Sequence, residues 1–172
     1  MNYNYRRVLV GADLSEQGDY VARKARDLAQ AFHANLYVIH VLDNIPMPDT
    51  AYGTMVPLDQ DSSYEMLETV KSRLKQLGDR LGLEPSHLWM VWGVPGEEIV
   101  RIAGQEHIDL IIVGSHARHG LGLLLGSTAS SVLHHAQCDV MAIRMPDEVA
   151  RGQPLSEPHS QSVWEAARNP AG

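Results

Sequence analysis

Ile-Asp-Leu-Ile-Ile-Val-Gly-Ser, residues 108–115, is the stretch that decides the fold. Five of its first six side chains are branched and apolar, without the polar alternation of a half-exposed strand. Such a run needs burial on both faces, which is typical of an interior strand in a parallel sheet. The glycine and serine that follow are expected to end this strand.

Four further apolar runs predict strands of the same buried type. They cover residues 7–12, 35–42, 87–92 and 139–144. Amphipathic helices are expected between them. The first helix follows Asp13 and Ser15, which can both cap it, and the second ends at Gly82. A third helix begins beyond Gly96, and a fourth is expected over 127–137.

Strands that alternate with helices predict a doubly wound, Rossmann-like α/β fold. We expect a five-stranded parallel sheet in the order 3-2-1-4-5, with helices on both faces. A long polar loop, residues 43–63, interrupts the alternation after the second strand. Ligands in such folds bind beyond the carboxyl ends of the strands, where the strand order reverses. The first and fourth strands therefore flank the expected crevice.

Bulk composition limits the possible functions. The 172 residues suit one domain, expected over 1–146, followed by a flexible C-terminal extension over 147–172. A net charge of −7 argues against a nucleic-acid partner, because binding to phosphates needs a basic face. The sequence has one cysteine, Cys138, and no signal peptide or apolar run near 18 residues. These features predict a cytoplasmic protein without membrane insertion.

The Gly-rich segment 114–131 carries the chemistry. Glycines after a strong strand let the backbone approach a ligand, and the helix start at Gly126, Ser127 and Thr128 offers N–H groups to an anion. This pattern predicts a phosphate-binding loop; the alternative is a surface loop in which Ser127 merely caps the helix. The segment lacks the Gly-Lys-Ser/Thr of a Walker A loop. The first strand–helix turn lacks the dinucleotide fingerprint G-x-G-x-x-G.

At this point the sequence resembles the universal stress protein family. Val-Gly-Ser-His-Ala-Arg-His-Gly at 113–120, Leu-Leu-Leu-Gly-Ser-Thr-Ala at 123–129 and Val-Leu-His-His-Ala at 132–136 look like its nucleotide loop and last helix. Val-Leu-Val-Gly-Ala-Asp-Leu-Ser at 8–15 looks like its first strand and acidic turn. The resemblance covers residues 5–145.

The resemblance implies an adenine nucleotide, with ATP first and magnesium as its companion ion. Asp13, next to Ala12, is expected beside the adenine and ribose, and Val41 against the base. The remaining expected contacts come from the loop and the helix start: Gly114, His116, Ala117, Arg118, Gly126, Ser127 and Thr128.

The loop departs from the family pattern at Ala117, where a second glycine is expected. Eight residues, not nine, separate it from Gly126. An alanine can crowd a contact between backbone and phosphate. A nucleotide-free protein-interaction module of the same fold therefore stays open as an alternative.

The last strand is predicted to be an edge that pairs with a second copy of the chain. Val140, Met141, Ala142 and Ile143 are apolar, and no strand is expected after them. The resemblance also implies a homodimer through this strand. No metal site is expected, because neighbouring His134 and His135 point about 100° apart on a helix.

The expected function is that of a homodimeric regulator of the stress response that binds an adenine nucleotide and is read by a protein partner. No residues are predicted to be catalytic, since Ser115 and His116 are adjacent rather than arranged as nucleophile and base. Slow ATP hydrolysis near Asp13 is a further alternative. Cys138 is expected to be a small buried hydrophobe rather than a reactive thiol.

Overall fold

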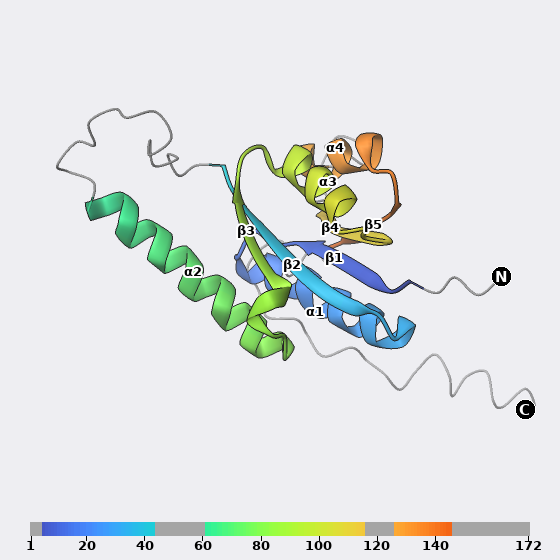
Figure 1. Ribbon diagram of the computed structural model, residues 1–172, viewed down its shortest axis with the longest axis horizontal. Helices are drawn as coiled ribbons and strands as arrows, with labels where there is room; N and C mark the ends of the chain where they lie inside the picture. The colour runs from blue at the N-terminus through green and yellow to red at the C-terminus, as the bar shows by residue number, and fades with distance from the viewer. Residues whose placement is uncertain (1–4, 44–60, 116–125, 146–172) are drawn as a thin grey trace, which may run out of the picture.

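The computed structural model describes residues 5–43, 61–115 and 126–145. Within these ranges five strands and four helices alternate, with one short 3₁₀ turn (Figure 1). In chain order they are β1 (Arg7–Gly11), α1 (Glu16–Phe32), β2 (Asn35–Leu42), α2 (Asp61–Leu81), the 3₁₀ turn (Pro85–His87), β3 (Leu88–Trp92), α3 (Pro95–Gln105), β4 (Leu110–Ser115), α4 (Ser127–His135) and β5 (Asp139–Arg144).

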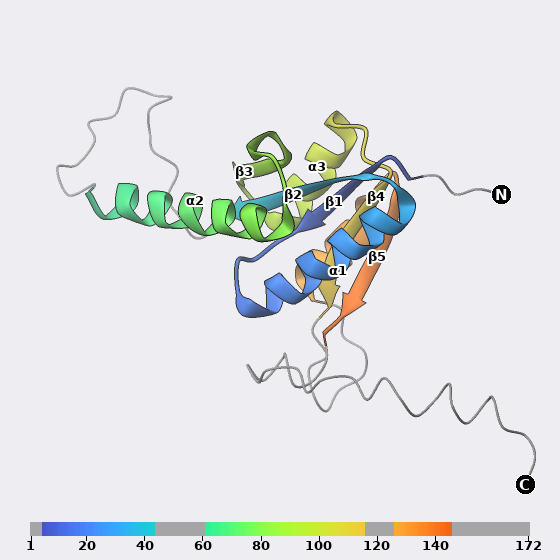
Figure 2. The ribbon, with the colours of Figure 1, turned by 90° about the horizontal axis from the view of Figure 1, so that it is seen from below.

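The strands form one sheet in the order β3-β2-β1-β4-β5, and every neighbouring pair is parallel. β1 lies at the centre, where Leu9 is in register with Tyr37 of β2 and Ile111 of β4. Helices α1 and α2 cover one face, and α3 and α4 cover the other (Figures 1 and 2). The predicted fold class, strand order and two-sided covering are confirmed.

Alternation along the strands separates two apolar cores. Val8 and Val10 of β1 face α1 and α2, and Leu9 between them faces α3 and α4. All three are fully buried, as are Ile111 and Ile112 of β4. The run at 108–115 therefore owes its apolar character to burial on both faces, as expected.

Several boundaries differ from the prediction. β4 begins at Leu110 because the N–H of Ile108 donates back to the carbonyl of Ala103, at the end of α3. β4 also runs through Gly114 and Ser115, which remain in register with β5. The start of α2 at Asp61 makes the expected loop shorter, and α4 ends at His135 because Ala136 is extended.

The sheet is anchored at its amino-terminal edge by Asp109. Its Oδ2 accepts the backbone N–H groups of Arg6 and Arg7 at 2.7 and 2.9 Å. These bonds hold the start of β1 against the start of β4, and the carboxyl ends of both strands lie at the opposite edge of the sheet. In the described ranges, no helix combines the length and apolarity needed to span a membrane.

Candidate functional site at the carboxyl edge of the sheet

A cleft of about 620 Å³ opens beyond the carboxyl ends of β1, β2 and β4. This volume lies within the range of small-molecule sites, and the position is the one expected from the topology. Residues from both helical layers contribute to its walls. Its lining consists of Gly11, Ala12, Asp13, Gly18, Val21, Ile39, His40, Val41, Leu42, Asp43, Met66, Val70, Pro95, Ile99, Gly114, Gly126, Ser127, Thr128, Ala129 and Met145.

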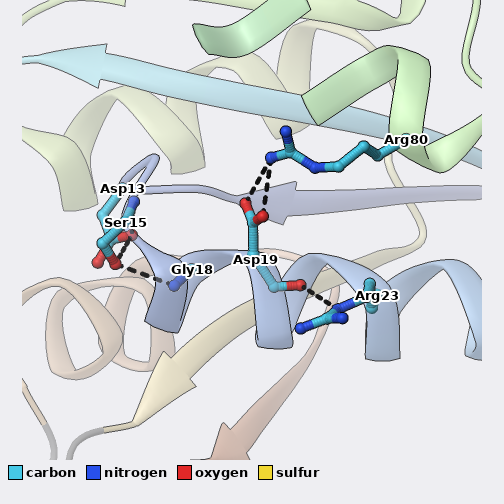
Figure 3. A network of polar contacts seen from close by, with 6 residues as sticks. All are labelled: Asp13, Ser15, Gly18, Asp19, Arg23 and Arg80. Carbon is cyan, nitrogen blue, oxygen red and sulfur yellow. Dashed lines mark hydrogen bonds and ion pairs between the residues drawn. The ribbon is translucent and has the colours of Figure 1, made fainter. Parts of the chain in front are cut away.

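The turn between β1 and α1 holds Asp13 in a defined orientation (Figure 3). Asp13 Oδ1 accepts hydrogen bonds from the backbone N–H and the hydroxyl of Ser15, at 3.0 and 2.7 Å. The Ser15 hydroxyl oxygen in turn accepts the N–H of Gly18 at 3.0 Å, which is the N-terminal cap of α1. The predicted capping role of Ser15 is confirmed, whereas Asp13 supports the cap through Ser15.

Gly18 leaves the space that the Asp13 carboxylate occupies. A Cβ built on Gly18 would lie only 2.1 Å from Asp13 Oδ1, far inside van der Waals contact. Within the turn, Leu14 has a φ of 58°, a left-handed conformation that is uncommon for a leucine. Two features therefore determine the turn. One is its set of hydrogen bonds, and the other is Gly18, because any larger residue there would displace the Asp13 carboxylate.

An ion pair between helices joins the helix after this turn to α2 (Figure 3). The Arg80 Nη2 lies 3.0 and 2.7 Å from the two carboxylate oxygens of Asp19. α2 supplies Met66 and Val70 to the cleft. The pair thus helps to fix the helix that forms one wall, although its partial exposure limits its contribution to stability.

The opposite wall includes the amino terminus of α4. Gly126 is the N-cap residue, with φ −58° and ψ 158°, and it provides no side chain to cap the helix. The interpretation of Ser127 as a mere side-chain cap is therefore wrong, because Ser127 is the first helical residue. The first N–H groups of α4 have no partner within the helix, so they can donate to an anion. A Cβ on Gly126 meets no described atom within 4 Å.

The end of β2 forms the remaining wall. Val41 is almost fully buried and belongs to the core on the α3 and α4 side. His40 next to it is half-buried and places its Nδ1 2.8 Å from the carbonyl oxygen of Ala12. The N–H of Ala12 donates to the Ile39 carbonyl at 2.9 Å, so β2 holds the end of β1 through both backbone and side chain.

Seven of the predicted nucleotide-binding residues line this one cleft: Ala12, Asp13, Val41, Gly114, Gly126, Ser127 and Thr128. The other three, His116, Ala117 and Arg118, lie outside the described residues, as do residues 44–60 of the expected loop and the expected extension 147–172. Sequence reasoning missed Gly18, His40 and the contribution of α2. The signal for His40 was a histidine within an otherwise apolar strand.

The polar groups of the cleft include two carboxylates, one imidazole, two hydroxyls and the N–H groups at the start of α4. In the part of the chain that the structure describes, no three His, Cys, Asp or Glu side chains gather in a way that could hold a metal ion. His134 and His135 instead lie beside carbonyl oxygens of their own helix, with Nδ1 at 2.8 Å in both cases.

Cys138 lies away from this cleft, in a separate depression lined by residues of α3 and of the turn after α4. Burial raises the pKa of its thiol, and the carboxylates of Asp139 and Asp109 raise it further. A raised pKa leaves less thiolate at neutral pH, in line with the expectation of an unreactive side chain.

Comparisons of the sequence and of the fold with known proteins both find members of the universal stress protein family. The model of the universal stress protein family matches residues 4–144. Universal stress protein A homolog 2 of Coxiella burnetii is 37% identical over 143 residues, which cover 83% of this chain and 97% of the relative. Solved structures with the same fold include the universal stress protein UspA from Lactobacillus plantarum (TM-score 0.60, 29% identity, 82% of this chain and 99% of that one).

A universal stress protein solved in complex with cAMP also shares the fold (TM-score 0.59, 21% identity, 82% of this chain and 98% of that one). The family model spans the whole described sheet and all four helices, and the relative from Coxiella matches over nearly its full length. The chain therefore belongs to the universal stress protein family.

Proposed function

We propose that this chain is a stress-response regulator that binds an adenine nucleotide, with ATP first, in the cleft beyond β1 and β4. One observation carries the proposal: an uncapped helix terminus, an oriented carboxylate and a buried apolar wall line the same cleft. These features complement the three parts of a nucleotide, which are phosphate, ribose and base. The volume of about 620 Å³ is ample for such a ligand.

The phosphates would lie at the start of α4. The N–H groups there have no partner within the helix, and the helix dipole favours negative charge. Ser127 and Thr128 add hydroxyl donors, and the absence of a side chain at Gly126 leaves the approach open. From the sequence, His116, Ala117 and Arg118 would complete this part of the site. Magnesium would arrive with ATP, bound mainly by the phosphate oxygens.

The nucleoside would lie across the cleft, against β1 and β2. Asp13 has one carboxylate oxygen fixed by Ser15, which orients the carboxylate to accept ribose hydroxyl groups. Val41 would pack on the base. A protein with the same fold was solved in complex with cAMP, which also combines adenine, ribose and phosphate, and this supports an adenine nucleotide as the class of ligand.

The proposal is tested by mass spectrometry of small molecules that co-purify with the native protein and by calorimetric titration with ATP and AMP. Gly126→Val is the disabling variant, because its side chain would cover the N–H groups of α4 while its extended conformation suits valine. Gly104→Val is the matched control, since Gly104 also has open space around it and lies outside the cleft. We expect Gly126→Val alone to lose binding; equal binding by both variants and the wild type would contradict the proposed phosphate site.

We also propose a homodimer formed along β5. Among the described residues, β5 pairs on one side only, with β4, and its Val140, Met141 and Ile143 are partly exposed and Ala142 exposed. A free apolar edge invites pairing with another strand. Light scattering of the wild type should give twice the chain mass, and Ala142→Arg should give the single-chain mass. A monomeric wild type would refute this proposal and leave the nucleotide proposal intact.

A further inference from the structure

His40 belongs to the wall of the cleft, although the site predicted from the sequence did not include it. It lies in β2 two residues before the end of the strand at Leu42 and is half-buried, whereas its neighbours Ile39 and Val41 are buried. His40 is one of the residues that line the cleft. In a neutral histidine one ring nitrogen donates a hydrogen bond and the other accepts one, so the partner of each nitrogen must be identified.

The Ala12 carbonyl determines which ring nitrogen carries the proton. A carbonyl oxygen can only accept, so His40 Nδ1, at 2.8 Å, must be the donor. In the neutral ring the other nitrogen, Nε2, is then an acceptor. No hydrogen bond joins Nε2 to another residue in the described parts of the chain. Among the residues that the structure describes, His40 is therefore a lining residue of the cleft whose ring has a fixed donor and an acceptor without a protein donor.

The strand order indicates which part of a nucleotide would meet this acceptor. β2 and β4 lie on opposite sides of β1, and the start of α4 follows β4. Phosphates at the start of α4 would therefore lie far from His40, and the nucleoside would lie near it. A nucleoside offers hydrogen-bond donors of two kinds, the exocyclic amine of adenine and the ribose hydroxyls.

We propose that His40 determines specificity by accepting, at Nε2, a hydrogen bond from a donor of the adenosine moiety. The assignment rests on the proposed nucleotide function and deepens it. Through Nδ1 the same ring donates to the carbonyl of Ala12, the residue before Asp13. This hydrogen bond fixes the tautomer in which Nε2 accepts from the ligand.

Two measurements test the assignment. Nitrogen-15 NMR of the imidazole in the ligand-free wild type, at a pH where His40 is neutral, should show the Nδ1–H tautomer. The protein is then titrated with ATP and with three analogues that each lack one donor. The triphosphate of purine riboside lacks the amine, and 2′-deoxy-ATP and 3′-deoxy-ATP each lack one ribose hydroxyl. The titrations should show which of these donors binds to Nε2. The wild type should bind the analogue without that donor about tenfold more weakly than ATP, the usual effect of one unmade hydrogen bond.

His40→Asn separates the two roles of the imidazole, which are the hydrogen bond from the ligand at Nε2 and the hydrogen bond to the Ala12 carbonyl at Nδ1. The asparagine amide can donate to the Ala12 carbonyl in place of Nδ1, but it has no atom at the position of Nε2. We expect this variant to fold, to bind ATP about tenfold more weakly than the wild type, and to bind ATP and the discriminating analogue almost equally.

Three results would overturn the assignment: the Nε2–H tautomer in the free protein, a wild type that binds all four nucleotides equally, or an unchanged discrimination ratio in His40→Asn. In each case ATP binding itself shows that the proposed function survives. A wild type that binds none of the four nucleotides would instead refute the proposed function, and the assignment to His40 with it.

Discussion

Replacing Gly18 with alanine tests whether the orientation of Asp13 is built into the fold. The new Cβ would lie 2.1 Å from Asp13 Oδ1, so the carboxylate would have to retreat by roughly 1 Å to restore normal contact. That movement breaks the two hydrogen bonds that Oδ1 accepts from Ser15. The same substitution would improve the helix, because alanine is favoured over glycine within α1.

The two effects have opposite signs and similar size. Two exposed hydrogen bonds contribute about 1–2 kcal/mol together, and the gain in helix propensity is about 0.5–1 kcal/mol. The free energy of unfolding should therefore fall by about 0.5–1 kcal/mol. If Asp13 accepts ribose hydroxyls, its displacement removes a charged hydrogen bond of about 1.5–3 kcal/mol, which lowers ATP affinity about 10- to 100-fold.

Urea unfolding and calorimetry with ATP measure both quantities. Gly104→Ala is the control, because Gly104 is also helical but its Cβ would meet nothing within 4 Å. The control should gain about 0.5–1 kcal/mol and keep the affinity of the wild type. Gly18→Ala that gains stability like the control and binds ATP normally would refute the reasoning.

Three further predictions concern residues outside the cleft. Asp109→Ala should lower the free energy of unfolding by about 2 kcal/mol in urea, because two backbone N–H groups of β1 lose their acceptor; an unchanged midpoint would contradict that anchoring role. Arg80→Ala should cost less than about 1 kcal/mol, since its pair with Asp19 is partly exposed, and any larger loss would show that this pair holds α2 in place. Cys138 should react with iodoacetamide at pH 8 more slowly in the folded than in the urea-unfolded chain, because burial raises its pKa and reduces the thiolate fraction. Asp139→Asn should speed that reaction by removing a carboxylate that raises the same pKa; equal rates in this variant and in the wild type would contradict the electrostatic part of the explanation.

The fold could be predicted because its main determinants are local and periodic. Residues 110–113 are apolar without interruption, and the structure buries both faces of this part of β4 between helices. The alternation of strands and helices along the chain is typical of a parallel sheet, so the type of sheet could be predicted as well. Boundaries were less certain: Gly114 and Ser115 stay in β4 because β5 pairs with them, and sequence alone does not show that pairing.

The candidate site could be predicted where its residues lie in recognisable turns and at a helix start. Asp13 and Gly126 fall at such positions, and both line the cleft. Gly18 could not be predicted, because its importance arises from the position of the Asp13 carboxylate across the turn. His40 was missed for a similar reason: its partner is a carbonyl 28 residues away in the sequence.

The most direct test of the central claim is an NMR titration of the nitrogen-15-labelled protein with ATP and magnesium. The account predicts saturable shifts of backbone amides around the cleft, at Asp13, Val41, Gly114 and Ser127, with little change at Cys138, which lines a separate depression. Absence of shifts at millimolar ATP, or shifts confined to the surroundings of Cys138, would contradict a nucleotide site beyond β1 and β4.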